Sequence, residues 1–265
     1  MSTQATLPPE TPAEAQSGGG VVLQRLVRRQ FDGVLLILAD CLDVLPIACD
    51  AVMTDPPYGH SWSGVNSTAK GGRNWTRRRA EKIIGHDEPY DPAPILALEV
   101  PTVLWGANHY ASRLPDSAAW LVWDKRGGTA ENNLSDCELA WCNVGGSARL
   151  KMHMWNGLCR DSEIGVHLHP TQKPVVVMAW AMDKAKIPVG ATVLDPYMGS
   201  GTTAIACLRT GRKFIGIEKD PKHYATAVER ISRELEQGEL LPPNDRRQES
   251  MPGASVAATE GNESK

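Results

Sequence analysis

The strongest constraint on the fold is a series of short, continuous apolar runs that alternate with segments of helical pattern. The runs of strand length lie at 34–40, 51–54, 101–106, 119–124, 139–144, 192–194 and 213–217. Continuous apolar strands are typical of a mostly parallel sheet that is covered on both faces. We therefore expect an α/β fold whose ligands bind at the carboxyl ends of the strands.

Helices are expected between or after these runs. The segments with a helical pattern lie at 41–48, where only a short turn fits, and at 174–186, 202–210 and 221–235. Pro174 stands in the first turn of one segment, where a missing N–H costs nothing. Gly211 follows another segment, at the position that commonly ends a helix.

Length and composition fit one such domain. The 265 residues, of which 42% are hydrophobic, are enough for a sizeable core. We expect the domain at 21–236, between polar segments at 1–20 and 237–265 whose composition predicts disordered tails. The net charge of −3 means that nucleic-acid binding must depend on local clusters of basic residues.

Several classes of protein are disfavoured by what the sequence lacks. It has no apolar run of about 18 residues, so no membrane span is expected, and residues 1–20 lack the pattern of a signal peptide. Six scattered cysteines in a chain of this size predict reduced thiols and a cytoplasmic protein. Without Cys-x-x-Cys or paired His spacing, no metal site is expected.

The first motif with a chemical meaning is Thr54-Asp55-Pro56-Pro57-Tyr58, at the end of the run 51–54. An exocyclic amino group on a base is a poor nucleophile because its lone pair is delocalised into the ring. The Asp55 carboxylate and the Pro56 carbonyl can accept its hydrogen bonds, Pro57 restricts the backbone, and Tyr58 can stack on the base. These four residues are candidate catalytic residues, although a rigid turn with an aspartate cap has the same sequence.

The second motif, Leu194 to Thr203, combines a strand end, a Gly-Ser-Gly turn and the start of a helix. Gly199 and Gly201 can adopt positive φ and leave room for a ligand, but a tight strand–helix connection also fits. Glu218 ends the next run, where an acid commonly binds a ribose diol. Because the turn is not Gly-x-Gly-x-x-Gly, a nucleoside cofactor without a diphosphate is favoured, such as S-adenosylmethionine.

The motifs together resemble a known family. Asp-Pro-Tyr-Met-Gly-Ser-Gly-Thr-Thr at 195–203 resembles the Asp-Pro-Phe-x-Gly-Ser-Gly-Thr-Thr of amino-directed DNA methyltransferases. His-Pro-Thr-Gln-Lys-Pro at 169–174 and Leu-Ala-Asp-Cys-Leu-Asp at 38–43 resemble two further segments of that family. With the target-base motif first and the glycine motif last, the order is the β-type order, over roughly 30–235. The compact build is similar to that of phage and prophage members.

The resemblance implies a Rossmann-like, S-adenosylmethionine-dependent methyltransferase fold, with a seven-stranded, mostly parallel sheet and helices on both faces. The implied cofactor-binding residues are Asp40, Cys41, Thr171, Lys173, Asp195, Tyr197, Gly199, Ser200, Gly201, Thr202, Thr203 and Glu218. Within this set, Thr171 and Lys173 are expected near the methionine carboxylate. Asp40 fits either the adenine amino group or the N-cap of the following turn.

The implied reaction is direct methyl transfer to the exocyclic N6 of a flipped adenine in double-stranded DNA, as in DNA methylation by restriction-modification enzymes. Aspartate at the first position of the 55–58 motif favours adenine, and cytosine N4 is the alternative. Two more distant alternatives are methylation of a protein glutamine and a DNA-binding relative without catalysis. The motif order and the aspartate disfavour the first, and the intact motifs disfavour the second.

A basic segment with tryptophans is the candidate DNA-binding surface. Its residues are Lys70, Arg73, Trp75, Arg77, Arg78, Arg79 and Lys82. Basic and aromatic side chains together suit phosphate contact and base stacking, although a solvated charged loop has the same composition. We expect the loops 61–86 and 145–168 to read a short target site together, and since relatives often dimerise, a homodimer stays open.

Overall fold

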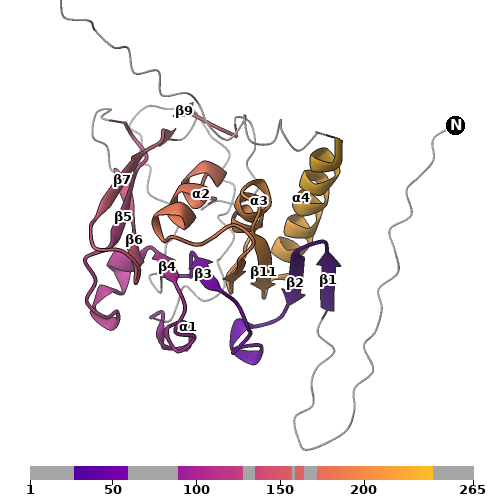
Figure 1. The fold of residues 1–265 in the computed structure, drawn as a ribbon, viewed down its shortest axis with the longest axis horizontal. Helices are drawn as coiled ribbons and strands as arrows, with labels where there is room; N and C mark the ends of the chain where they lie inside the picture. The colour runs from indigo at the N-terminus through magenta and orange to yellow at the C-terminus, as the bar shows by residue number, and fades with distance from the viewer. Residues whose placement is uncertain (1–26, 59–88, 128–134, 157–158, 164–171, 241–265) are drawn as a thin grey trace, which may run out of the picture.

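The computed structural model describes residues 27–58, 89–127, 135–156, 159–163 and 172–240, and its centre is one large sheet (Figure 1). The nine strands of this sheet follow the order β1-β2-β11-β10-β3-β4-β6-β5-β7. Their bounds are β1 Val27–Phe31, β2 Val34–Leu38, β3 Ala51–Thr54, β4 Thr102–Trp105, β5 Trp120–Asp124, β6 Cys137–Cys142, β7 Arg149–Met152, β10 Thr192–Asp195 and β11 Lys213–Glu218. A separate two-stranded ribbon joins β8 (Trp155–Asn156) to β9 (Cys159–Arg160).

The sheet is mostly parallel, as predicted. The neighbours β2, β11, β10, β3 and β4 all run parallel, while β6 is antiparallel to both β4 and β5. In the order of the sheet, the seven strands β2, β11, β10, β3, β4, β6 and β5 correspond to the predicted seven-stranded sheet. One strand more lies at each edge, because β1 pairs antiparallel with β2 and β7 pairs parallel with β5.

Helices cover the two faces of the sheet unequally. The long helices α2 (Val175–Lys184), α3 (Thr202–Arg209) and α4 (Pro221–Leu240) lie side by side on one face (Figure 1). The other face is covered by α1 (Ala93–Leu96) and by short 3-10 turns, including Cys41–Asp43 and Ala107–His109. Each face therefore has its own apolar cluster, and helices lie on both, as the sequence predicted.

The alternation of side chains along the strands explains these two clusters. Along β3, Ala51 and Met53 belong to the cluster under the long helices, whereas Val52 belongs to the opposite cluster. Successive strand residues point to opposite faces, so a continuous apolar run serves both cores at once. On α4, Ala227 and Ile231 are spaced by one helical turn and bury the inner stripe of the helix.

The predicted boundaries mostly agree with the structure. The run 51–54 is β3 in full, whereas β6 begins two positions earlier than the predicted strand at 139–144, and α4 continues beyond 235 to Leu240. None of the described helices is long and apolar enough to cross a membrane. Within the described ranges, no three His, Cys, Asp or Glu side chains gather as a metal ion would require.

Candidate active site

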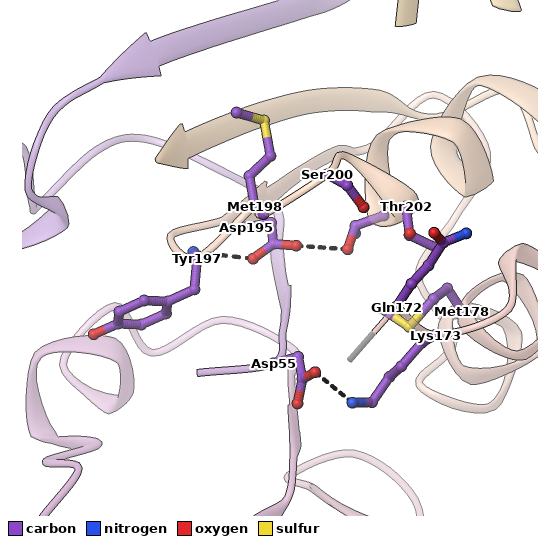
Figure 2. Close-up of a pocket in the computed structure, with 11 residues that line it drawn as sticks. Asp55, Gln172, Lys173, Met178, Asp195, Tyr197, Met198, Ser200 and Thr202 are labelled. Atoms are coloured by element: carbon purple, nitrogen blue, oxygen red, sulfur yellow. Dashed lines mark hydrogen bonds and ion pairs between the residues drawn. The ribbon is translucent and has the colours of Figure 1, made fainter. Parts of the chain in front are cut away.

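The two sequence motifs meet at the carboxyl ends of the neighbouring strands β3 and β10. An open pocket lies there, with about 410 Å³ of empty space that includes open solvent. Its lining residues are Asp55, Gln172, Lys173, Met178, Asp195, Tyr197, Met198, Gly199, Ser200, Thr202 and Thr203. In Figure 2, Asp55 and Lys173 point toward one another, and Asp195 lies on the adjoining strand end. One pocket therefore combines the predicted catalytic aspartate with most of the predicted cofactor-binding residues.

Asp195 connects the two motifs. Its carboxylate accepts hydrogen bonds from the Thr203 hydroxyl at 2.5 Å, from the Thr54 hydroxyl at 2.6 Å and from the Tyr197 backbone N–H at 3.1 Å. Burial raises the pKa of Asp195 to about 6, although these hydrogen bonds oppose the shift. Since Thr54 immediately precedes Asp55, Asp195 ties the end of β3 to the first turn of α3.

The glycine turn uses its two glycines differently. Both have positive φ, 54° at Gly199 and 81° at Gly201, as predicted. A Cβ at Gly199 would meet open space, so Gly199 leaves room at the pocket wall. A Cβ at Gly201 would lie 3.3 Å from the Ala227 Cβ and the Ile231 Cδ1, so Gly201 allows α4 to pack closely against α3 instead.

Three predicted cofactor-binding residues lie beside the pocket without lining it. The Glu218 carboxylate accepts the Gly199 N–H at 2.8 Å and the Asp220 N–H at 2.8 Å, so it fixes the glycine turn. Asp40 accepts the Leu42 N–H at 3.1 Å, which is the N-cap geometry considered from the sequence, and pairs with Lys219 at 2.6 Å. Cys41 is buried, and its thiol is in hydrogen-bond contact with Tyr197.

The predicted catalytic segment follows β3. The Tyr58 hydroxyl donates to the Asp55 carboxylate at 2.5 Å, and the Lys173 ammonium forms an ion pair with the same carboxylate. Pro56 is buried and Pro57 is half-buried, which is consistent with a fixed backbone at this turn. Burial, and then the charge of Asp55, raises the pKa of Tyr58 well above its ordinary value, so Tyr58 is a hydrogen-bond donor here.

The ring of Tyr58 is held by two residues that the sequence did not single out. It stacks on His109 with the ring centroids 4.8 Å apart and an interplanar angle of 15°. On Gly106, which has a φ of 67°, a Cβ would lie only 1.9 Å from the Tyr58 Cε1. Gly106 is thus the residue type that lets the Tyr58 ring take this position.

Lys173 lines the pocket, and its ammonium is paired with Asp55 and, at 3.0 Å, with Glu138 on β6. Its expected place near a methionine carboxylate stays a prediction. Although burial disfavours the charged form, the two carboxylates raise the pKa of Lys173. Glu138 was not predicted as a site residue. The signal that could have identified it was an acidic residue beside the apolar run of β6, because a buried charge needs a partner.

A second ion pair supports the segment that carries Lys173. Glu163 accepts from the Val175 backbone N–H at 3.0 Å, from the Gln172 side chain at 3.2 Å and from Arg230 at 2.8 Å. Arg230 also donates to the Thr202 hydroxyl at 2.9 Å. The start of α2 is therefore tied to α3 and α4, and these contacts hold Gln172 and Lys173 at the pocket.

Several predicted residues lie outside the described part of the chain. They are Lys70, Arg73, Trp75, Arg77, Arg78, Arg79, Lys82 and Thr171. The loop 61–86 lies there as a whole, whereas much of 145–168 is described and forms β7 and the ribbon of β8 and β9. In that ribbon, the Arg160 guanidinium lies 4.0 Å from the centre of the Trp155 ring.

The residues of the pocket fit a cationic nucleoside cofactor such as S-adenosylmethionine. Open space at Gly199 allows close approach of a ligand to the backbone, and the buried carboxylate of Asp195 faces the same pocket. A buried carboxylate such as that of Asp195 attracts a positive group more strongly than a carboxylate in water does. Ser200 and Thr202 add hydroxyl groups to the wall.

Comparison with known proteins agrees with this site. Residues 108–229 match the family model N6_N4_Mtase, described as DNA methylase. That match includes the glycine motif, Lys173 and Glu218, and the structure brings Asp55, from outside the matched region, into the same pocket. Residues 108–229, a little under half of the chain, are thus similar to the DNA methylase family.

Individual relatives match over shorter stretches. The type II methyltransferase M2.LlaDCHI of Lactococcus lactis subsp. cremoris is 37% identical over 81 residues, which is 30% of each chain. M2.DpnII of Streptococcus pneumoniae is 37% identical over 84 residues, which is 31% of each chain. The match thus spans less than a third of these relatives.

Solved structures of similar shape were also found. The M1.HpyAVI–SAM complex has a TM-score of 0.45 at 23% identity, over 74% of this chain and 99% of that one. The PvuII DNA methyltransferase (cytosine-N4-specific) has a TM-score of 0.49 at 14% identity, over 77% of this chain and 92% of that one.

Proposed function

We propose that this chain transfers a methyl group from S-adenosylmethionine to the exocyclic amino nitrogen of a base in double-stranded DNA, and that the base is adenine. The observation that carries the proposal is the shared pocket, which is lined by Asp55 and by the glycine turn at Gly199. Methyl transfer needs the donor and the acceptor within reach of each other, and this arrangement supplies both sides.

The chemistry follows from the acceptors at the end of β3. When bound, S-adenosylmethionine supplies a methyl group on a positively charged sulfur. The Asp55 carboxylate accepts a hydrogen bond from the target N–H and draws electron density toward that nitrogen. As the nitrogen–carbon bond forms and the carbon–sulfur bond breaks, the sulfur keeps the electron pair, and the proton lost from the nitrogen passes to the Asp55 carboxylate and then to water. No covalent bond to the protein is needed.

The base must leave the duplex to reach this pocket, at a cost of a few kcal/mol. We assign the stacking role to Tyr58, whose ring lies against His109. Stacking between aromatic groups offsets part of the cost of extrusion, at about 1–3 kcal/mol per base.

DNA contacts are proposed for the two loops expected from the sequence. Within the described part of the loop 145–168, Arg149, Lys151 and Arg160 add basic side chains. The basic segment 70–82 supplies the remaining charge for phosphate contact. A cytoplasmic location and a homodimer are the cellular and oligomeric states we propose to test first.

The choice of adenine rests on aspartate at the first position of the 55–58 motif. Methylation of cytosine N4 needs the same hydrogen-bond acceptor and the same displacement at the methyl carbon. One experiment therefore distinguishes the two target bases. The purified protein is incubated with labelled S-adenosylmethionine and unmethylated DNA, and the modified nucleoside is identified by mass spectrometry. Detection of N6-methyladenine supports the proposal. Detection of N4-methylcytosine shows that cytosine, not adenine, is the target base. Label found only on protein shows that DNA is not the substrate.

A further inference from the structure

An unassigned feature of the pocket is a chain of four alternating charges. Lys125, directly after β5, contacts one carboxylate oxygen of Glu138 at 2.9 Å, and Lys173 contacts the other at 3.0 Å. Lys173 in turn pairs with Asp55. The order is Lys125, Glu138, Lys173, Asp55, so positive and negative groups alternate from the edge of the site to the catalytic carboxylate.

This arrangement answers a difficulty in the proposed reaction, on which the inference rests. Asp55 must turn an oxygen toward the target amino group, yet in the resting site the carboxylate is occupied by Lys173. The Lys173 side chain is only 5% exposed, so water cannot replace a lost partner. A buried ammonium without a counter-charge is strongly unfavourable, and this would hold Asp55 in its resting pair.

We propose that Glu138 is a positioning residue for methyl transfer, which holds the Lys173 ammonium while Asp55 turns to the target amino group. Glu138 contacts neither the base nor the cofactor in this role. It acts through Lys173, by giving the ammonium a second anionic partner at 3.0 Å. Asp55 then exchanges one hydrogen-bond donor for another without leaving a buried charge unpaired.

The charges around Lys173 are consistent with this role. The groups that face it are Asp55 and Tyr58 from the β3 end, Glu138 from β6 and Tyr110, while the Trp105 ring lies 5.5 Å from its nitrogen. Although burial opposes ionisation, the two lysines lower the pKa of Glu138 to about 2. Glu138 is thus an anion throughout the working pH range.

The test uses the full chain and three variants of the charge chain. In Glu138→Gln, Lys173 keeps only Asp55, so the single-turnover rate of DNA methylation should fall at least about 20-fold. S-adenosylmethionine affinity, measured by calorimetry, should stay within about threefold. Glu138→Asp keeps the charge and should recover a large part of the lost rate. Glu234→Gln removes a carboxylate from the ion pair with Arg209 on the opposite end of α3, and is the matched control.

A titration separates positioning from mere structural support. Glu138→Gln removes an anion near Lys173, so the alkaline limb of the pH–rate profile should move to lower pH. Lys125→Met removes a cation and should move that limb to higher pH. The side-chain nitrogen resonance of Lys173, assigned by its loss in Lys173→Met, should titrate in the same directions without cofactor or DNA.

The outcomes are distinct. An inactive wild-type chain would count against the proposed function, not against Glu138 alone. Active wild type with an unchanged rate in Glu138→Gln overturns the inference, as does a rate loss explained by weaker cofactor binding. If Glu138→Gln does not fold, the Lys125→Met profile still decides: an alkaline limb that stays in place or moves to lower pH overturns the inference.

Discussion

The ends of two neighbouring strands carry the same Asp-Pro dipeptide, but the two aspartates differ in burial and in the charge of their partners. Asp55-Pro56 follows β3 and Asp195-Pro196 lies at the end of β10. The Asp55 side chain is 22% exposed and has a cationic partner in Lys173, whereas Asp195 is 3% exposed and is held by neutral hydroxyl and N–H donors. The Asp-Pro dipeptide is shared by both strand ends, so the chemical difference between the two carboxylates comes from the residues around them.

This difference suits the two carboxylates to different roles in the pocket. The Asp55 carboxylate contacts a cation and a hydroxyl, and it can exchange one of these partners for a reacting amino group. A carboxylate that is buried among neutral donors is costly to ionise, and burial raises its pKa to about 6. That cost is repaid when a positive ligand enters. We therefore assign the reacting amine to Asp55 and the positive end of the cofactor to Asp195.

The largest effect is expected from Asp55→Ala. Loss of the acceptor should lower the methylation rate by about 10³-fold or more, since a positioned proton acceptor contributes about 10²–10⁴-fold. S-adenosylmethionine affinity should change by no more than about threefold in calorimetry. Asp55→Asn is the control that keeps the shape and removes the charge. Retained turnover in the alanine variant would end the division between the two aspartates.

A smaller effect is expected from Gly106→Ala. A Cβ at this position would overlap the Tyr58 ring, at 1.9 Å from Cε1, so the ring must move. We expect a loss of about 10²-fold in rate, with cofactor binding retained. Gly190→Ala is the matched control, because its φ is also positive at 84° but its Cβ would meet nothing within 4 Å. Equal losses in both variants would mean that backbone strain, not Tyr58, explains the effect.

A pH dependence is expected on the side of Asp195. Because the folded pKa is raised to about 6, this group is ionised above that pH and protonated below it. Affinity for the positively charged cofactor should therefore fall below pH 6, by about tenfold for each pH unit. Calorimetry from pH 5 to 8 measures this, and Asp195→Asn should give weak binding without the slope. A flat profile in the wild-type chain would assign the cofactor charge to another group.

The smallest effect is expected from Thr203→Val. The variant removes a hydroxyl that donates to Asp195 at 2.5 Å, which should cost about 1–2 kcal/mol of unfolding free energy. With one donor fewer, the pKa of Asp195 rises, so the midpoint of cofactor binding should move to higher pH. Thr226→Val is the control, since its hydroxyl donates only to a helix carbonyl at 3.0 Å. Denaturant unfolding should separate the two variants.

The sequence predicted the buried strands well because each is a continuous apolar run between turn signals. The edge strands were not predicted, for the opposite reason. β1 (Val27–Phe31) and β7 (Arg149–Met152) each have largely exposed, mixed side chains, so no run stands out. Edge strands need only one partner and can carry charges, which protects them from unwanted pairing.

The sequence motifs located residues that line the pocket, but contacts that cross elements were missed. Asp55 and Gly199 were both predicted near the carboxyl ends of strands, and they line one pocket. Glu138 and His109 belong to no motif, because their roles come from the sheet order that brings β6 beside β4. The pairing of Lys173 with Asp55 likewise depends on tertiary distance, which periodicity does not encode.

The strand order also sets the timing of assembly. β2 and β3 are close in the chain, but in the sheet β11 and β10 stand between them. On a ribosome, both early strands emerge long before residues 192–218 exist. The edge of β2 that pairs with β11 and the edge of β3 that pairs with β10 therefore stay vacant until those residues are made. Long-range pairings of this kind slow folding and expose aggregation-prone edges. Because residues 195–203 form one wall of the pocket, the pocket can be completed only after that part of the chain has been made.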